Sequence, residues 1–328
     1  MINEVEKNKN KIIVAAIDVG TLKSKFEIRE FKGKSSKTLY KDKKLTVLGR
    51  DLDKTDNVIV EKSIQSTTSA LKEFKQKMDE YHVGRYRAVT TEAIRRARNS
   101  REVLARIKKE TGIKLKTLSH KNEASILFKS ISQEFPNKLI AVADIGGGSV
   151  QVVIGENDKI YETHLFKTGT YYLQEEFSKT HHPTKKELDN AIKYIKHELC
   201  PLASSLNKPQ FLVYGTTNII DFLQAMNIQM SINDKSKLHP YSLQLKKLIP
   251  LYDKIVSFSY EDRMAMYPEE PYYMWAADKA LMNVFEICNY LKISKIVPSN
   301  NNISTAILYD LANKKSQPKL RIFWQELS

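Results

Sequence analysis

Cysteine is scarce in this chain of 328 residues. Its two cysteines, Cys200 and Cys288, lie far apart in helix-like sequence, a pattern typical of reduced intracellular thiols. This argues against a disulfide framework, and at this length the chain can bury a substantial core without a disulfide or a structural metal. We therefore expect two globular lobes of ordinary size and a cytoplasmic location.

Long apolar runs are also missing. None approaches the roughly 20 residues that a membrane span needs, and residues 1–11 are polar and charged, unlike a signal peptide. The seven histidines show no zinc-ligand spacing with one another or with cysteine. No nucleic-acid-binding motif is present either. Neither a membrane nor nucleic acid is expected as a partner.

Acidic residues are in the minority, since 53 lysines and arginines stand against 38 aspartates and glutamates, for a formal net charge of +15. Such an excess attracts polyanions such as nucleic acid, anionic lipid or a phosphate-rich small substrate. Charge alone does not choose among them, and a well-solvated lysine-rich surface has the same composition.

One order of predicted elements occurs twice along the chain. A buried-strand run at 11–20 opens the first half, and a similar run at 139–145 opens the second. In each half further strands follow, and helices come next, such as the periodic segment 63–81. In the second half, further strands are predicted at 150–155, 159–166 and 210–214, and near 293–297. The pattern predicts an α/β protein.

The two halves meet at residues 128–138, where Pro136 interrupts the pattern. We predict domains at residues 1–130 and 131–328. The last helix, expected from about Ile303, could pack back on the first domain.

Glycine is rare, yet five of the eleven glycines directly follow strand-like runs, in "DVGT", "DIGGGS" and "VYGTT". Glycine lets a backbone approach a ligand closely, and consecutive N–H groups of such a turn form a concavity that binds anions. For "DVGT" or "VYGTT" alone, a tight solvent-facing turn is the simpler interpretation. Three consecutive glycines carry an entropic cost that favours a phosphate-binding role for "DIGGGS". The residues concerned are Gly20, Gly146, Gly147, Gly148 and Gly215, with the hydroxyls of Thr21, Ser149 and Thr216.

These turns belong to longer stretches that resemble the exopolyphosphatase and guanosine pentaphosphate phosphatase family, Ppx/GppA, of the actin, hexokinase and Hsp70 superfamily. The stretches are "AAIDVGTLKSKFEI" at 15–28, "AVTTEAIRRARNS" at 88–100, "TLSHKNEASILF" at 117–128, "ADIGGGSVQVVIG" at 143–155 and "FLVYGTTNII" at 211–220. The resemblance covers most of 12–222 and fades after about 230. It corresponds to the short two-domain form of the family.

The resemblance implies two ribonuclease-H-like (actin-like ATPase) lobes with an interdomain cleft. Inorganic polyphosphate or a guanosine polyphosphate would lie in that cleft, with Mg²⁺ (or Mn²⁺) helping to bind the terminal phosphoryl group. Family members often pair, which makes a homodimer a further expectation, although no segment of this sequence marks an interface.

Roles follow position by position from the same resemblance. Glu123 matches the glutamate thought to activate the attacking water, and Arg95 matches an arginine able to grip two phosphate oxygens. Asp144 matches a metal-binding aspartate. Asp18 and Gln151 complete the expected metal site, and Lys23 and Lys25 join the glycine turns as expected phosphate-binding residues. Arg96 and Arg98 have a simpler interpretation as solvated helix residues.

Two departures from the family pattern bear on activity. Leu22-Lys23 stands where the first loop usually has Asn-Ser, and Val150-Gln151 stands where the second usually has Thr-Glu. Gln151 can donate an oxygen to a metal, but it neither takes a proton nor offsets the charge of the ion. Three functions therefore stay open: a Mg²⁺-dependent phosphohydrolase, a regulator that binds polyphosphate or guanosine polyphosphate without turnover, and a kinase-like ATPase.

Overall fold

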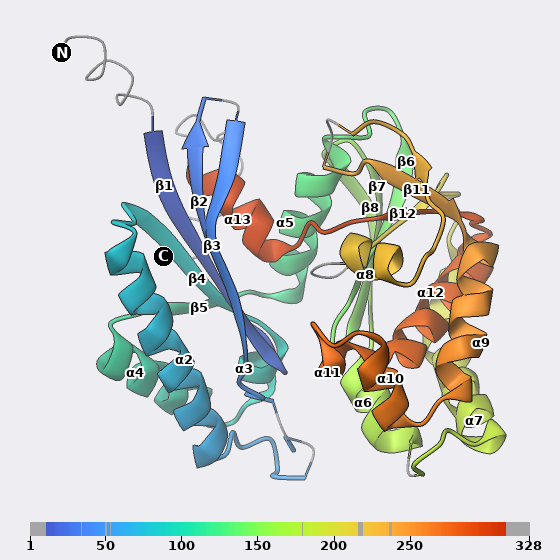
Figure 1. Ribbon diagram of the computed structural model, residues 1–328, viewed down its shortest axis with the longest axis horizontal. Helices are drawn as coiled ribbons and strands as arrows, with labels where there is room; N and C mark the ends of the chain where they lie inside the picture. The colour runs from blue at the N-terminus through green and yellow to red at the C-terminus, as the bar shows by residue number, and fades with distance from the viewer. Residues whose placement is uncertain are drawn as a thin grey trace. The chain divides into compact units, whose positions relative to one another are not determined.

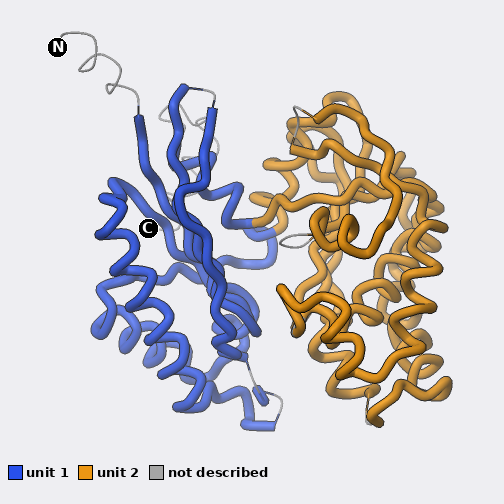
Figure 2. The backbone as a smooth tube through the Cα atoms, in the orientation of Figure 1, with its two compact units in different colours: residues 1–123, 303–328 blue, residues 124–302 orange. Residues whose placement is uncertain are grey.

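The computed structural model describes residues 11–33, 35–49, 51–52, 54–178, 180–215, 219–235 and 238–312. The chain forms two compact units, shown in Figure 2. The first contains residues 1–123 and 303–328, and the second contains residues 124–302. The change of unit falls between residues 123 and 124, inside helix α5 (His120–Ser132), whereas the predicted division lay between residues 130 and 131.

The first unit is built on a five-stranded mixed sheet with the order β3-β2-β1-β4-β5 (Figure 1). Strands β1, β4 and β5 run parallel, whereas β2 and β3 are antiparallel to their neighbours. The strands are β1 (Lys11–Val19), β2 (Lys23–Lys32), β3 (Ser35–Leu45), β4 (Arg85–Thr90) and β5 (Leu115–Thr117).

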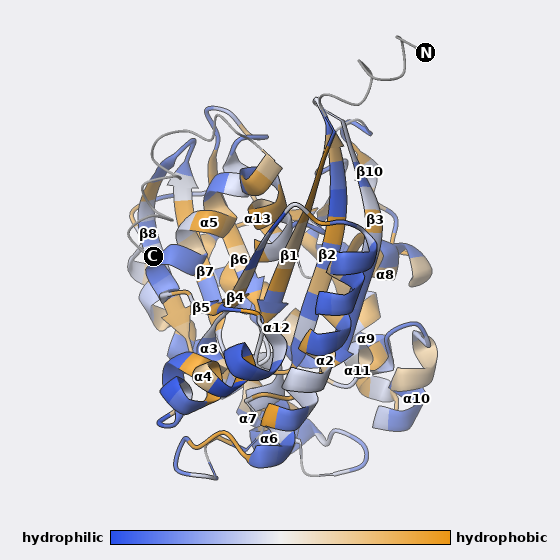
Figure 3. Ribbon diagram, turned by 90° about the vertical axis from the view of Figure 1, so that its left-hand side faces the viewer, coloured by the Kyte–Doolittle hydropathy of each residue, from blue (hydrophilic) through white to orange (hydrophobic). Residues whose placement is uncertain are grey.

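Helices pack on both faces of this sheet. The core on one face joins β1 and β2 to α2 (Glu61–Glu80) and α4 (Ser100–Thr111), with the rings of Phe26 and Phe74 stacked at 4.7 Å. Figure 3 shows mainly hydrophilic residues on α2, beside the apolar residues of β1. On the other face, α13 (Ile303–Ala312) contacts β2 through Phe31 and Tyr309, whose ring centroids are 5.2 Å apart. The last helix is therefore part of the first unit. The short helix α3 (Glu92–Arg96) follows β4.

The second unit contains a seven-stranded sheet with the order β10-β11-β12-β9-β6-β7-β8. Its five strands β8-β7-β6-β9-β12 repeat the order and directions of β3-β2-β1-β4-β5. The strands are β6 (Leu139–Ile145), β7 (Val150–Glu156), β8 (Lys159–Phe166), β9 (Leu212–Gly215), β10 (Ser231–Ile232), β11 (Tyr241–Gln244) and β12 (Lys295–Pro298).

This second sheet also has a core on each face. One core includes Phe128 of α5 and Val142 of β6. The other includes Val152 of β7, together with Ile195 of α7 and Ile287 of α12. The helices are α6 (Thr170–Phe177), α7 (Lys185–Leu199), α8 (Ile219–Ala225), α9 (Ile249–Ser257), α10 (Tyr260–Met266), α11 (Pro271–Met274) and α12 (Ala277–Leu291), with short 3₁₀ turns η1 (Cys200–Ser204) and η2 (Leu245–Leu248).

The predicted α/β class with two ribonuclease-H-like lobes is confirmed. Strands predicted at 139–145 and 159–166 coincide with β6 and β8, and α2 covers the predicted helix at 63–81. In the described part of the chain, helices with enough length and apolar character to cross a bilayer do not occur. A cleft between the lobes stays a prediction.

Candidate phosphate-binding site

Two equivalent hairpin turns lie at the ends of β1 and β6. In the first, the N–H of Gly20 donates to the carbonyl of Lys23, and in the second the N–H of Gly146 donates to the carbonyl of Ser149, both at 3.0 Å. A Cβ atom on either glycine would come within 3.2 Å of the accepting oxygen. The predicted tight turns after the two strands are therefore present, and each contains a close backbone approach that favours glycine.

Neighbouring segments occupy the carbonyl side of the Gly146 turn. The carbonyl of Gly146 accepts the N–H of Thr170 at 2.9 Å, and that of Gly147 accepts the N–H of Tyr171 at 2.9 Å, both from the start of α6. The described peptides are trans, and a trans peptide directs its N–H opposite to its C=O. The N–H groups of Gly147 and Gly148 therefore point away from α6, as an anion-binding turn requires.

The Gly20 turn is also held through carbonyl groups, here by the segment after β3. The carbonyl of Thr21 accepts the N–H of Gly49 at 2.9 Å, and that of Leu22 accepts the N–H of Val47 at 2.8 Å. The N–H groups of Leu22 and Lys23 therefore point away from this segment. The bonded carbonyls belong to the second and third residues of this turn, whereas in the Gly146 turn they belong to the first and second, so the outward N–H groups of the two turns differ by one position.

Each hairpin places an aspartate opposite a polar residue of the next strand. Asp18 is in register with Lys25, and Asp144 is in register with Gln151, so each pair lies on one face of its sheet. Asp18 and Gln151 are only 8% and 5% exposed. Burial raises the pKa of Asp18, and the positive charge of Lys25 partly opposes that rise. The first hairpin thus places a cation opposite its carboxylate, whereas the second places an amide there.

The pair Asp144 and Gln151 offers oxygen donors of the kind that Mg²⁺ prefers. Within the described ranges, groups of three or more His, Cys, Asp or Glu side chains able to hold a metal do not occur. Mg²⁺ commonly keeps several waters and is held by one or two carboxylates together with substrate phosphates. The residues present therefore fit an ion that binds together with phosphate, and they do not form a complete protein cage.

The third predicted turn, at Gly215, has a structural reason for its glycine. A Cβ atom there would lie 1.8 Å from the carbonyl oxygen of Ser299 and 2.8 Å from its carbonyl carbon. Gly215 is in register with Asp144 of β6, so it lies at the carboxyl ends of the parallel strands, the edge where α/β proteins commonly bind ligands. The predicted phosphate-binding Thr216 lies outside the described residues.

Arg95 and Glu123, predicted to act on substrate, form an ion pair. Arg95 Nη1 donates to Glu123 Oε2 at 2.7 Å and to the carbonyl of Leu118 at 2.6 Å, and Nη2 donates to Glu92 Oε2 at 3.0 Å. The side chains of Arg95 and Glu123 are 14% and 13% exposed. Arg95 thus fixes the orientation of the Glu123 carboxylate through one oxygen. Sequence reasoning missed Glu92, which follows the strand β4.

Two neighbouring arginines are engaged elsewhere. Arg96 Nη2 donates to Asn57 Oδ1 at 3.1 Å, and Arg98 forms an exposed ion pair with Asp56. Arg96 ends α3 and is partly exposed, whereas Arg98 is exposed but lies in the turn between α3 and α4, so its expected helical position is wrong.

A buried hydrogen-bond chain beside Gly215 was not predicted. Glu134 Oε2 contacts His239 Nδ1 at 2.6 Å, and His239 Nε2 contacts Ser299 Oγ at 2.8 Å. The N–H of Asn301 also donates to Ser299 Oγ, at 3.0 Å. His239 and Ser299 are 2% and 1% exposed, so the serine is not placed to attack a substrate. This series of hydrogen bonds holds the loop after β12 in place beside Gly215. Because its members come from three distant segments, no local pattern signals it.

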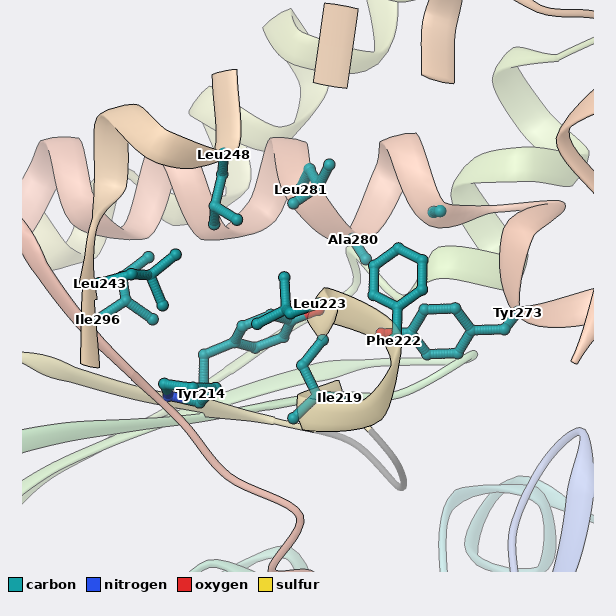
Figure 4. Close-up of a pocket in the computed structure, with 12 residues that line it drawn as sticks. Tyr214, Ile219, Phe222, Leu223, Leu243, Leu248, Tyr273, Ala280, Leu281 and Ile296 are labelled. Atoms are coloured by element: carbon teal, nitrogen blue, oxygen red, sulfur yellow. The ribbon is translucent and has the colours of Figure 1, made fainter. Parts of the chain in front are cut away.

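A pocket beside α8 is apolar, unlike the glycine turns described above (Figure 4). It is lined mainly by apolar side chains such as Phe222, Leu223 and Leu281, with the rings of Tyr214 and Tyr273. Burial raises the pKa of Tyr214 to about 12, so its hydroxyl stays neutral at physiological pH. None of its lining residues is charged, and the pocket is a packing gap in the core that does not suit phosphate.

A model of the Ppx/GppA phosphatase family matches residues 28–314. The chain is 26% identical over 327 aligned residues to a bifunctional 3-dehydroquinate synthase/phosphatase of Fusobacterium nucleatum, covering 94% of this chain and 48% of that protein. It is 24% identical to a guanosine-5'-triphosphate,3'-diphosphate pyrophosphatase of Photobacterium profundum, with 97% and 63% covered. An exopolyphosphatase 2 of Mycobacterium tuberculosis is 23% identical, with 79% and 84% covered. The chain thus spans about half to two thirds of the length of the first two relatives.

Solved structures share the fold. A structure of an exopolyphosphatase from Cytophaga hutchinsonii superimposes with a TM-score of 0.81 at 24% identity, covering 92% of this chain and 98% of that one. A Ppx/GppA family member from Aquifex aeolicus gives a TM-score of 0.77 at 24% identity, covering 94% and 99%. The match extends over both units, well beyond the segments that carried the resemblance in sequence.

Proposed function

The chain belongs to the Ppx/GppA phosphatase family, and on that basis we propose that it releases terminal phosphate from inorganic polyphosphate or guanosine pentaphosphate. The reaction is attack of water on the terminal phosphorus with loss of the bridging oxygen to the remaining chain. Mg²⁺ (or Mn²⁺) is proposed to bind together with the substrate. A cytoplasmic location and pairing of two copies belong to the same proposal.

The turn at Gly146 is the observation that carries the proposal. Its carbonyl groups are bonded to the start of α6, and the N–H groups of Gly147 and Gly148 therefore point the other way. Fixed N–H groups bind phosphate oxygens without reorganisation, and phosphoryl transfer depends mainly on positioning and charge stabilisation. Asp144, the residue before the last of β6, supplies a carboxylate next to the turn.

Glu123 is the proposed general base, taking a proton from the attacking water. One of its oxygens is bonded to Arg95, which orients the carboxylate. When bound, Mg²⁺ supplies positive charge to the terminal phosphoryl group. Asp144 and the amide oxygen of Gln151 are the residues proposed to hold it. Arg95 would assist by pairing with phosphate oxygens, for which it must exchange one of its two carboxylate partners.

Gln151 favours a second candidate function, a regulator that binds polyphosphate or guanosine polyphosphate but turns it over slowly. A buried amide opposite Asp144 contributes no charge toward a divalent ion. Binding by the turns would survive this change, whereas metal-assisted catalysis would be weakened.

Phosphate release separates the two candidates. Purified protein is assayed with long-chain polyphosphate, guanosine pentaphosphate and ATP, each with Mg²⁺, with Mn²⁺ and with a chelator. A phosphohydrolase releases phosphate from one of the first two substrates and loses activity with the chelator. Glu123→Gln should lower kcat by roughly 100-fold or more, whereas Glu102→Gln, an exposed carboxylate on α4, should not. Tight binding of either compound without phosphate release would contradict catalysis and support the regulator.

A further inference from the structure

The segment after β8 lies against the carbonyl side of the Gly146 turn. Three successive N–H groups, those of residues 170–172, donate to the carbonyls of Gly146 and Gly147 over 2.9–3.1 Å. They belong to the first turn of α6, where a helix offers no partners of its own for its N–H groups. The start of α6 and the glycine turn therefore satisfy each other. We call residues 168–172 the clamp segment.

Gly169 brings the backbones of the clamp segment and the turn into direct contact. A Cβ atom on Gly169 would lie 2.3 Å from the carbonyl carbon of Gly148, and 2.4 Å from both the carbonyl oxygen of Gly147 and the backbone nitrogen of Ser149. All three are backbone atoms, so a rotamer change cannot make room for a methyl group. The path of the clamp segment therefore decides where the backbone of the turn lies.

A buried amide of α12 holds the other end of the clamp segment. Asn283 Nδ2 donates to the carbonyl of Thr168 at 2.9 Å, and to the carbonyl of Lys279, one helical turn earlier, also at 2.9 Å. The orientation of the amide follows from these partners, because the flipped amide would set its oxygen against two carbonyl oxygens. Asn283 and Thr168 are fully buried, so water does not compete for these bonds.

Packing alone would favour an apolar side chain at position 283. The nearby α12 residues Val284 and Ile287 are buried in the apolar core of the second unit. Asn283 Oδ1 has no hydrogen-bond partner among the described residues, and a buried unpaired oxygen costs free energy. The two bonds of Nδ2 offset that cost, and the one to Thr168 reaches outside the helix.

A second contact joins the same end of α12 to the clamp segment. The ring of Tyr171 packs on that of Trp275, which lies two residues before α12, with the centroids 5.7 Å apart and the planes inclined at 50°. Aromatic pairs in this range attract each other. The clamp segment is thus held at Thr168 by an amide and at Tyr171 by an aromatic ring.

We propose that Asn283 and Gly169 are positioning residues for the phosphate-binding turn. Neither would touch the phosphate. Asn283 fixes the clamp segment, and the clamp segment in turn fixes the carbonyls of Gly146 and Gly147 and so the direction of the N–H groups that follow them. A turn held in this way binds phosphate oxygens without reorganising, which is when fixed N–H groups are most effective. The inference rests on the proposed function for the role of the turn.

Hydrogen exchange tests the clamp segment without any ligand. In the wild type, the N–H groups of residues 170–172 should exchange slowly, because each is bonded to a carbonyl of the turn. Asn283→Leu removes both donors but keeps a side chain of similar size. It should speed exchange at 170–172 roughly 10-fold relative to that of the β6 amides, as expected for one lost buried hydrogen bond. Ile287→Val removes one buried methyl group from the same helix and is the control for a general loss of stability.

Calorimetry with tripolyphosphate then measures the consequence for binding. Asn283→Leu and Gly169→Ala should each weaken binding roughly 10-fold or more, the effect of one lost charge-assisted hydrogen bond. The matched controls, Ile287→Val and Gly84→Ala, should bind as the wild type does. A Cβ atom on Gly84 would meet its nearest atom only at 3.9 Å, so this second glycine can accept a methyl group.

A spectroscopic readout separates positioning from a loss of stability. In ligand-free Asn283→Leu, the amide NMR signals of Gly147 and Gly148 should already differ from those of the wild type. The signal of Gly112, in the first unit, should be unchanged. Ile287→Val should leave all three signals at their wild-type positions.

The outcomes keep this inference apart from the proposed function. If Asn283→Leu matches Ile287→Val in exchange and in affinity, Asn283 does not position the turn, whatever the activity. Fast exchange at 170–172 in the wild type would mean that the clamp segment is not bonded to the turn, a result that needs no variant to fold. If the wild type binds no tripolyphosphate, the inference fails. If binding depends on Asn283 but no substrate yields phosphate, the positioning role stands and hydrolysis is wrong.

Discussion

Replacement of Gly215 by alanine tests the packing of the sheet edge at which the site is proposed. The new Cβ atom would start 1.8 Å from the carbonyl oxygen of Ser299, whereas an ordinary contact lies at 3.4–4 Å. The obstacle is backbone, so a rotamer change does not relieve it. Strands β9 and β12 must move apart, and the hydrogen bond from the Ser299 N–H to the Tyr214 carbonyl, 3.0 Å long, is lost or strained.

The expected cost combines two terms. Overpacking a well-packed site costs about 1–3 kcal/mol, and loss of a buried hydrogen bond adds about 1 kcal/mol. A destabilisation of about 3 kcal/mol corresponds to a fall in Tm of about 6–12 °C for a unit of this size. Differential scanning calorimetry measures it for Gly215→Ala.

Gly84→Ala is the matched control for this experiment. Its Cβ would be 3.9 Å from the nearest atom, the carbonyl oxygen of Ile13, so its Tm should stay close to that of wild type. A Gly215→Ala protein whose Tm matches that of Gly84→Ala would show that β9 and β12 do not approach as described, and would remove the structural reason for this glycine.

Three further predictions concern the carboxylates and their partners. Gln151→Glu places a second negative charge beside Asp144 and should raise the affinity for Mg²⁺ in the presence of polyphosphate by roughly 10-fold. Metal titration of phosphate release or of polyphosphate binding measures this affinity. An unchanged metal dependence would show that Asp144 and Gln151 do not belong to the metal site. Arg95→Gln leaves the half-buried carboxylates of Glu92 and Glu123 without their shared cation. The free energy of unfolding, measured with urea, should fall by about 2 kcal/mol, and activity should be lost. Stability equal to that of wild type would mean that the ion pairs are absent in solution. Burial raises the pKa of Glu134, but its contacts with the His239 ring and with two backbone N–H groups outweigh burial. The pKa of Glu134 is therefore below its ordinary value. Its contribution to stability is therefore full above the ordinary pKa of glutamate and is lost as the pH falls through the lowered pKa; Glu134→Gln should flatten the acid limb of a Tm-against-pH curve, and an unaltered limb would contradict this.

The hairpins of the site were predictable because their signals are local. Buried runs that end in Asp-x-Gly mark the ends of β1 and β6, and the glycines mark turns that both form. The short strands β10 and β11 were not predicted. Ser231–Ile232 and Tyr241–Gln244 are too short for a periodic pattern, and their pairing depends on β12, which is distant in sequence.

Contacts between distant segments account for what sequence reasoning did not find. The bond of His239 to Glu134 and Ser299 joins residues 60 or more positions apart. Alternation along 41–43 places two lysines on one face, but only the register of β3 with β2 shows that this is also the face of Lys23 and Lys25. The glycine of "VYGTT" is explained by its contact with Ser299.

The central claim is that the N–H groups of Gly147 and Gly148 bind a phosphate group. Titration of ¹⁵N-glycine-labelled protein with tripolyphosphate, followed by amide NMR, tests it directly, because only eleven glycines contribute signals. Assignments come from single Gly→Ala variants. The account predicts that the amide signals of Gly147 and Gly148 shift most and saturate together, while that of Gly112, which ends α4 in the first unit, does not move. Saturable binding that leaves both of these amides unshifted would contradict it.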